Sequence, residues 1–171
     1  MTEPLDAAAL RALQRPLKER YKEDPATALV TNSVTATLLE DSISAVVPTW
    51  AGDVQAGLHP ATGGDGSEAC SADLLLNALA ACAGVTLRSV ATALGVTFDK
   101  AEVTVTGTWD ARGTLGVAKD APVGLTDIAL SFDLATDADD ATVTKLLELT
   151  ERYCVIAQTL AAAPEVTFAR A

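Results

Sequence analysis

Three cysteines and one histidine are the side chains of this 171-residue chain best suited to redox or nucleophilic chemistry. They are Cys70, Cys82, Cys154 and His59. One histidine and no C-x-x-C spacing make a structural zinc site unexpected, and no metal or other cofactor is predicted. A catalytic triad would need His59, but that residue precedes Pro60 in a loop, where a surface or hydrogen-bonded role is expected.

The spacing of the cysteines limits how they can pair. Three are too few for a disulfide framework. Cys70 and Cys82 would lie about 18 Å apart along a helix, whereas a disulfide needs Cα atoms within about 7 Å. Cys154 is expected at a helix start, where the helix dipole favours a thiolate. Any intrachain pair is therefore more plausible between Cys82 and Cys154, although periodicity alone favours a buried, inert thiol at Cys82.

The elements that must position these groups follow from residue patterning. An apolar stretch over 71–94, with Asp73 in its first turn and Gly95 after it, predicts a long helix buried on more than one face. Alternating Val, Thr and Ile predict strands, whereas apolar residues at helical spacing predict further helices. The predicted strands are a hairpin over 32–49 with its turn at residues 40–41, a short strand over 53–57, and strands over 96–109, 124–134 and 166–169; the predicted later helices cover 141–152 and 153–162.

Composition and charge limit the kinds of partner that the chain is expected to bind. The chain has 49% hydrophobic residues, a net charge of −11 and a sequence pI near 4.3. A nucleic-acid binder needs a basic footprint, so neither nucleic acid nor an anionic membrane surface is an expected partner. The apolar stretches contain polar breaks and are expected to fall short of the roughly 20 residues that span a bilayer, and the start of the chain resembles no signal peptide. A cytoplasmic protein is expected.

The first 25 residues differ from the rest. Leucines and a tyrosine recur at helical spacing among basic and acidic residues, which predicts an amphipathic helix. Pro16 is expected to kink or interrupt it, and Pro25 to end it. The expected organisation is thus an N-terminal helical extension over 1–25 and one α+β domain over 26–171. The glycines at 63, 64 and 66 lack the signature of a phosphate-binding loop and predict a turn.

Two motifs resemble the OsmC/Ohr family of organic hydroperoxide reductases. The run from Ser71 to Cys82 (SADLLLNALAAC) resembles the family's central-helix motif, and Tyr153-Cys154-Val155-Ile156 resembles the motif in which a cysteine opens a later helix. The resemblance covers roughly residues 30–170. It implies an α+β fold with antiparallel sheets packed around a long central helix, in an intertwined homodimer.

The resemblance also implies a mechanism. Cys82 would attack the peroxide as a thiolate and become a sulfenic acid, Cys154 would condense with it to a disulfide, and a dithiol reductant would reset the pair. An apolar pocket of Leu75, Leu79 and Ile156 would favour alkyl or lipid peroxides.

The sequence departs from the family pattern at two positions. Ala72 stands where the reductases place a glutamate, and the first hairpin has no arginine to hold the thiolate. A cation would then come from the N-terminal helix, with Arg15, Lys18 and Arg20 as candidates, reaching the site of a partner chain. The alternative is a non-catalytic dimer of the same fold that binds a small apolar or thiol-containing ligand.

Overall fold

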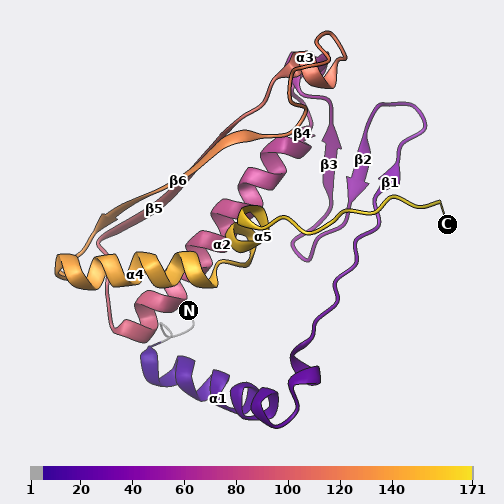
Figure 1. Ribbon diagram of the computed structural model, residues 1–171. Helices are drawn as coiled ribbons and strands as arrows, with labels where there is room; N and C mark the ends of the chain where they lie inside the picture. The colour runs from indigo at the N-terminus through magenta and orange to yellow at the C-terminus, as the bar shows by residue number, and fades with distance from the viewer. Residues whose placement is uncertain (1–5, 171) are drawn as a thin grey trace. The chain divides into compact units, whose positions relative to one another are not determined.

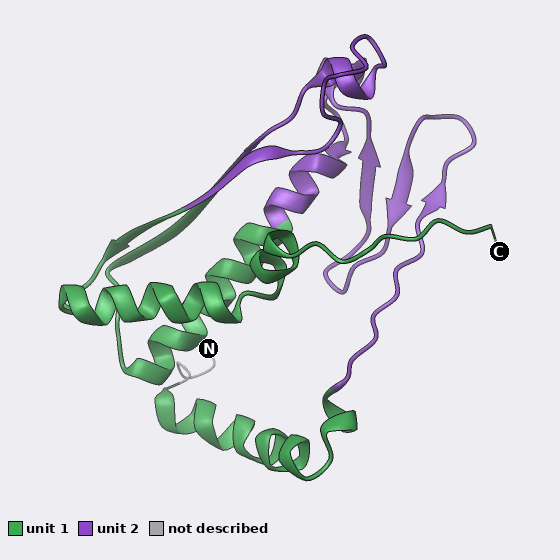
Figure 2. Cartoon of the chain, viewed as in Figure 1, with its two compact units in different colours: residues 1–28, 78–104, 131–171 green, residues 29–77, 105–130 purple. Residues whose placement is uncertain are grey.

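The computed structural model describes residues 6–170, which fall into two compact units (Figures 1 and 2). Within this range unit 1 holds residues 6–28, 78–104 and 131–170, and unit 2 holds residues 29–77 and 105–130. The element order is α1 (Ala7–Glu23), η1 (Pro25–Ala28), β1 (Thr37–Leu38), β2 (Ala45–Val47), β3 (Val54–Gly57), η2 (Pro60–Thr62), β4 (Ala69–Cys70), α2 (Ser71–Leu94), β5 (Lys100–Thr108), α3 (Ala111–Thr114), β6 (Thr126–Ala135), α4 (Asp140–Tyr153) and α5 (Val155–Ala161). The α+β class expected from the sequence is confirmed.

The core of unit 1 forms on one stripe of α2. Leu79, Ala83, Leu87 and Ala91 recur every four residues along this helix, and all are buried. Leu87 and Ala91 pack with Val96 and Leu146, around which lie half-buried apolar side chains of β5, β6 and α4, among them Val103, Phe132, Leu134 and Leu147. Alanine at two stripe positions keeps the helix surface narrow, so neighbouring elements can approach it closely.

The end of α2 follows from one glycine. Gly95 takes a φ of +74°, a left-handed conformation that glycine adopts without strain. The backbone N–H of Val96 then donates to the carbonyl of Ala91 at 2.9 Å. This closing turn directs Val96 into the core, as the sequence predicts for a helix ending before Gly95.

Strands β5 and β6 form a two-stranded sheet with alternating burial. The alternation places Phe132 and Leu134 on the face that packs into unit 1 and leaves Asp133 exposed. Asp133 accepts from Lys100 Nζ at 2.6 Å across the strands. Such an exposed ion pair contributes little stability, so packing on the apolar face is the main support of the sheet.

Unit 2 is built on a four-stranded sheet in the order β1-β2-β3-β4. The predicted hairpin is confirmed, since β1 and β2 pair antiparallel with Thr37 opposite Val46. The predicted strand over 53–57 is β3, and it pairs antiparallel with β2. Strand β4, which the sequence analysis did not anticipate, pairs parallel with β3 and leads directly into α2.

A cluster of polar side chains next to β3 stabilises this sheet. The Glu68 carboxylate accepts from Ser44 Oγ at 2.7 Å and also from the side-chain amide of Gln55. A Cβ at position 57 would lie 1.7 Å from Glu68 Oε2, so Gly57 gives the carboxylate its room. Because Ser44 is buried, this contact also satisfies a hydroxyl that water does not reach.

Two sequence expectations were wrong, and a third was wrong in part. Residues 166–169 form no strand in the described chain, and Phe168 is 95% exposed, because no neighbouring strand there pairs with this segment. Of the predicted kink or interruption at Pro16, the interruption is wrong: helix α1 continues through this residue, since the loss of one hydrogen bond does not break a helix of 17 residues. The segment 110–123, expected to be a loop, contains the short helix α3, which Asp110 caps through the backbone N–H of Arg112.

One described helix, α2, is long and apolar enough to meet the length and composition test for a membrane span, with a mean hydropathy of 1.6 over its most apolar window. The expectation that no stretch reaches this length was therefore too strict, because the many alanine, leucine and valine residues outweigh the polar ones in the mean. The core helix of a water-soluble protein passes the same test, and four side chains of α2 are buried within the fold.

We expect Leu146→Ala to lower the free energy of unfolding by about 2–5 kcal/mol, because Leu146 is fully buried in the core of unit 1. Urea denaturation followed by circular dichroism measures this change. Leu115→Ala is the matched control, since Leu115 is 55% exposed and should change stability by less than about 1 kcal/mol. Equal losses in both variants would contradict the assigned core.

Candidate redox site at Cys82 and Cys154

Two elements of unit 1 position the cysteine pair. Cys82 lies half-buried on α2, three residues after the buried Leu79 and four before Thr86. Cys154 is 1% exposed and is the single residue between α4 and α5, directly after the first helix and directly before the second. All three cysteines of the chain are free thiols.

The backbone at Cys154 makes this placement possible. Its φ of −75° and ψ of 103° are extended, so the chain turns between two helices without a glycine or proline. The Cys154 N–H donates to the carbonyl of Thr150 at 3.0 Å, and its carbonyl accepts from the N–H of Gln158 at 3.0 Å. The cysteine thus belongs to the hydrogen-bonding pattern of both helices, while its side chain leaves the N-terminus of α5 uncapped.

Several donors converge on the sulfur of Cys82. Burial alone would raise the pKa of this thiol. Hydrogen bonds to the sulfur oppose that effect, and the donors are the backbone N–H groups of Ile156 and Val155, the Cys154 thiol and the Thr86 hydroxyl. Their combined effect is the larger, so the pKa of Cys82 lies below that of an ordinary cysteine.

The second thiol has the opposite character. Burial raises the pKa of Cys154, the nearby Cys82 sulfur raises it further, and the N–H groups of Ala157 and Ile156 only partly oppose the rise. The contact between the two thiols is one of the causes that lower the pKa of Cys82 and raise that of Cys154. Of the two cysteines, Cys82 is therefore the one at which the thiolate, the nucleophilic form, is favoured.

The basic side chains expected to support the thiolate are elsewhere in the described chain. Arg15, Lys18 and Arg20 lie exposed on α1, where Arg15 Nε is 4.0 Å from a carboxylate oxygen of Glu19. None of the three is among the groups that shift the pKa of Cys82 within residues 6–170. In this part of the chain, backbone amides and a hydroxyl supply the stabilisation instead.

The sequence did not predict these donors. The expected helix start at Cys154 indicated an effect of the helix dipole on Cys154 itself, not on Cys82. Thr86 follows Cys82 by four residues, a spacing that puts both side chains on one face of α2. That spacing was the available signal for Thr86, whereas the direction of α5 toward Cys82 depends on tertiary packing.

The side chains predicted to line an apolar pocket differ in burial. Leu79 is 4% exposed, whereas Leu75, one turn earlier on α2, is 39% exposed. Ile156 is half-buried, and its backbone N–H contributes to the stabilisation of Cys82.

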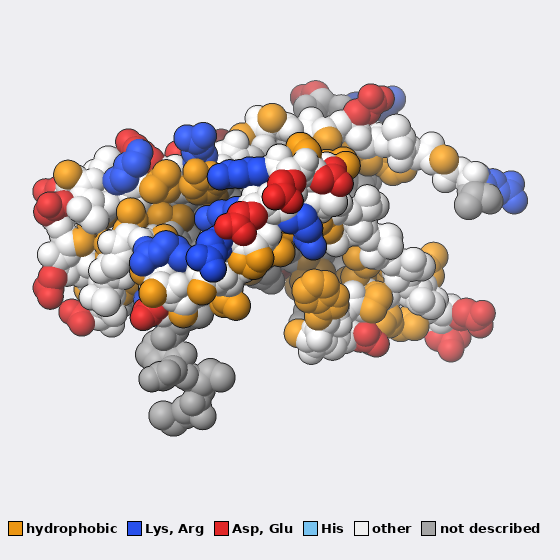
Figure 3. All heavy atoms as spheres, turned by 90° about the horizontal axis from the view of Figure 1, so that it is seen from below, with side chains coloured by type: hydrophobic (Ala, Val, Ile, Leu, Met, Phe, Trp, Pro, Cys, Tyr) orange, Lys and Arg blue, Asp and Glu red, His pale blue; other side chains and the backbone are white. Residues whose placement is uncertain are grey.

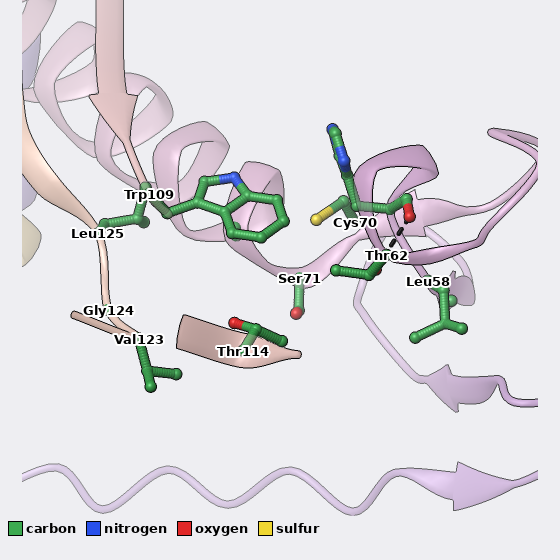
Figure 4. A pocket seen from close by; sticks show the side chains of 12 residues that line it. Leu58, Thr62, Cys70, Ser71, Trp109, Thr114, Val123, Gly124 and Leu125 are labelled. Carbon is green, nitrogen blue, oxygen red and sulfur yellow. Dashed lines mark hydrogen bonds between the residues drawn. The ribbon is translucent and has the colours of Figure 1, made fainter. Parts of the chain in front are cut away.

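A separate cavity of about 350 Å³ lies within unit 2 and contains the third cysteine (Figure 4). His59 lies at its wall, and the Nδ1 of this residue accepts from the N–H of Ala61 at 2.9 Å. The expected hydrogen-bonded role of His59 is confirmed. The glycine segment after it forms turns, with φ of +99° at Gly63 and +81° at Gly66, as predicted.

We expect Thr86→Val to raise the pKa of Cys82, because valine has the shape of threonine but donates no hydrogen bond. The rate of iodoacetamide labelling at Cys82 should fall about two- to tenfold at pH 7, the equivalent of one hydrogen bond, and its pH profile should shift to higher pH. Mass spectrometry of the labelled peptide measures both quantities. Thr92→Val is the control on the same helix, since the Thr92 hydroxyl donates to the Arg88 carbonyl; an equal effect there would contradict the role of Thr86.

Comparison with known proteins shows which proteins share this fold. Among curated protein sequences, none matches the chain. Solved structures with the same fold include an OsmC-like protein from Mycoplasma pneumoniae, with 22% identity, a TM-score of 0.65, and coverage of 78% of this chain and 89% of that one. An OsmC-like protein of unknown function from Vibrio cholerae has 13% identity and a TM-score of 0.61, with coverage of 77% and 94%.

A third similar structure is an organic hydroperoxide resistance protein OsmC from Legionella pneumophila, with 13% identity, a TM-score of 0.55, and coverage of 78% and 93%. At these identities the likeness establishes the fold alone. The sequence model of the OsmC-like protein family matches residues 64–169, which include Cys70, Cys82 and Cys154 and make up more than half of the chain. The chain belongs to the OsmC-like protein family.

Proposed function

We propose that this protein is a thiol-dependent peroxidase that reduces organic hydroperoxides through Cys82 and Cys154. The observation that carries the proposal is the opposite shift of the two thiol pKa values, which favours the thiolate at Cys82 and disfavours it at Cys154. Membership of the OsmC-like family supports a redox role in general terms, and a structure with this fold is named as an organic hydroperoxide resistance protein.

The first step is oxidation of Cys82. Its thiolate attacks the terminal oxygen of the hydroperoxide, a sulfur–oxygen bond forms and the oxygen–oxygen bond breaks. The peroxide leaves as an alkoxide and takes up a proton to give the alcohol, while Cys82 becomes a sulfenic acid. The lowered pKa of Cys82 favours this step because the thiolate is the reacting form.

The second step joins the two sulfurs. Cys154 attacks the sulfenic sulfur, a disulfide forms and water leaves. A dithiol reductant then attacks the disulfide, becomes oxidised to its own disulfide, and returns both cysteines to thiols. Cys154 suits the resolving role because its raised pKa disfavours the thiolate, the form that would itself react with peroxide.

The proposed substrate contacts are Leu75, Leu79 and Ile156. Apolar side chains favour an alkyl or aryl substituent over the small, polar hydrogen peroxide, since burial of each CH₂ group contributes roughly 0.8 kcal/mol. Organic hydroperoxides are therefore the proposed substrates.

The proposed assembly is a homodimer in which the basic side chains of α1 serve the site of the partner chain. Large apolar side chains are exposed in this chain, with Leu13 at 62%, Leu17 at 42% and Val85 at 72%, and such surfaces favour association. Figure 3 shows Lys and Arg side chains gathered on the face that carries α1, with apolar side chains among them. A second copy would cover this apolar surface and bring a cation to a thiolate.

We expect one equivalent of cumene hydroperoxide to remove two free thiols per chain within seconds, because Cys82 and Cys154 form one disulfide. Thiol titration with a chromogenic disulfide measures the loss, and peptide mass spectrometry identifies the bridge. Cys82→Ser should lose no thiol. Cys154→Ser should stop at the sulfenic acid, which dimedone traps.

Cys70→Ser is the matched control and should behave like the unsubstituted protein. Loss of thiols at the same rate in Cys82→Ser would contradict the proposal. No loss over minutes in the unsubstituted protein would favour the alternative of a non-catalytic binding protein, which the alanine at position 72 also favours.

The combined variant Arg15→Gln, Lys18→Gln and Arg20→Gln should lower kcat/KM for cumene hydroperoxide at least about tenfold, because a charge-assisted contact to a thiolate contributes roughly 1.5–3 kcal/mol. Light scattering should give the mass of a dimer for this variant, so that lost assembly is not mistaken for lost chemistry. Arg11→Gln with Lys22→Gln is the control on the same helix. Unchanged kinetics in a dimeric triple variant would exclude the role of α1.

A further inference from the structure

The cavity of unit 2 has the features of a small-molecule site. Its volume of about 350 Å³ is at the lower end of the range for ligand pockets. Apolar side chains form most of the wall. The lining residues include Leu58, His59, Cys70, Ser71, Trp109 and Thr114. All of them belong to unit 2, so this cavity does not contain Cys82 or Cys154.

An aromatic corner fixes one side of the cavity. The rings of His59 and Trp109 meet edge to face, with centroids 5.2 Å apart and planes at 86°. Figure 4 shows the Cys70 sulfur pointing toward the Trp109 ring. His59 is held in turn, because its Nδ1 accepts from the Ala61 N–H and its carbonyl accepts from Thr62 Oγ1 at 2.9 Å.

The loop beside this corner is closely packed. A Cβ at position 64 would lie 1.7 Å from the carbonyl oxygen of Leu58, so only glycine allows the loop to fold back on itself here. The wall is thus largely formed before any ligand enters, which lowers the entropy lost on binding.

Charge excludes ionic ligands from this cavity. No lining residue is Asp, Glu, Lys or Arg. Two carboxylates close to it in sequence already have partners, since Glu68 accepts from Ser44 at 2.7 Å and Asp110 accepts from Arg112 Nε at 3.0 Å. In a chain of net charge −11, an anion entering this cavity would meet no compensating side-chain charge, and a cation would meet none either.

Polar groups remain to orient a ligand. Within residues 6–170, the hydroxyls of Ser71 and Thr114 line the cavity and make no hydrogen bond to another described residue. With Nδ1 accepting a hydrogen bond, the proton of the His59 ring is on Nε2, which is a further donor. These groups match one hydroxyl or carbonyl on an otherwise apolar molecule.

We propose that the cavity of unit 2 binds a small uncharged molecule that has an aryl or branched alkyl body and a single hydroxyl or carbonyl group. The body packs against Trp109 and the aliphatic wall, and the polar group pairs with the free hydroxyls. This site is separate from the cysteine pair and goes beyond the proposed peroxidase.

Tryptophan fluorescence tests the proposal directly. The chain has two tryptophans, and Trp50 is fully exposed, so Trp50→Phe leaves Trp109 as the single reporter. The probe is 2-phenyl-2-propanol, titrated into the full-length Trp50→Phe protein. We expect a saturable change in Trp109 emission as the probe is added. At saturation, maleimide should label Cys70 at least about threefold more slowly than it does without the probe.

A matched pair of variants tests the location of the site. Ala72→Leu places three more carbons at the wall and should weaken probe binding at least about tenfold, whereas Ala93→Leu, exposed on the same helix, should leave it within about twofold. No saturable signal in the Trp50→Phe protein, or equal weakening in the two variants, would overturn the proposal. Tighter binding of 3-phenylpropionate than of the alcohol would overturn the uncharged class. Because the peroxidase assay follows Cys82 and Cys154, either proposal can fail without the other.

Discussion

Stabilisation of the Cys82 sulfur by the first N–H groups of α5 is the interaction on which the candidate site depends. Burial opposes a charge at Cys82, and without these donors the thiol would keep its proton. The N-terminus of α5 leaves them available because the Cys154 side chain does not cap it. A residue that begins a helix without capping it therefore performs two tasks, since it leaves the amides free and adds its own thiol as a donor.

The fold holds these groups at fixed positions through the core of unit 1. The small stripe on α2 lets other elements approach the helix, and Leu146 of α4 packs into it. Helix α4 ends at Tyr153, so the register of Leu146 against α2 also sets the place of Cys154 opposite Cys82. Residues far from the sulfurs in sequence thus determine the geometry of the pair.

The sequence pattern predicted those helices and strands that bury one face in the fold. The apolar stretch and Gly95 predicted α2, and the alternation of Val and Thr predicted the hairpin and the long strands, because burial on one face leaves a periodic trace. The segment 166–169 shows the limit, since alternation without a neighbouring strand produced no strand. The backbone donors of α5 at Cys82 could not be predicted in the same way, because their positions depend on where α5 begins and on the direction in which this helix points.

The short length of α5 makes the stability of this helix sensitive to the oxidation state of the cysteine pair. Seven residues form a helix that is marginal alone, and a thiolate at Cys82 would stabilise it through the N-terminal amides. A disulfide carries no such charge, so oxidation would release the amides of Val155 and Ile156 from an electrostatic restraint. Fraying of the first turn of α5 would then distinguish the oxidised from the reduced protein. Amide hydrogen exchange would detect this fraying as faster deuterium uptake.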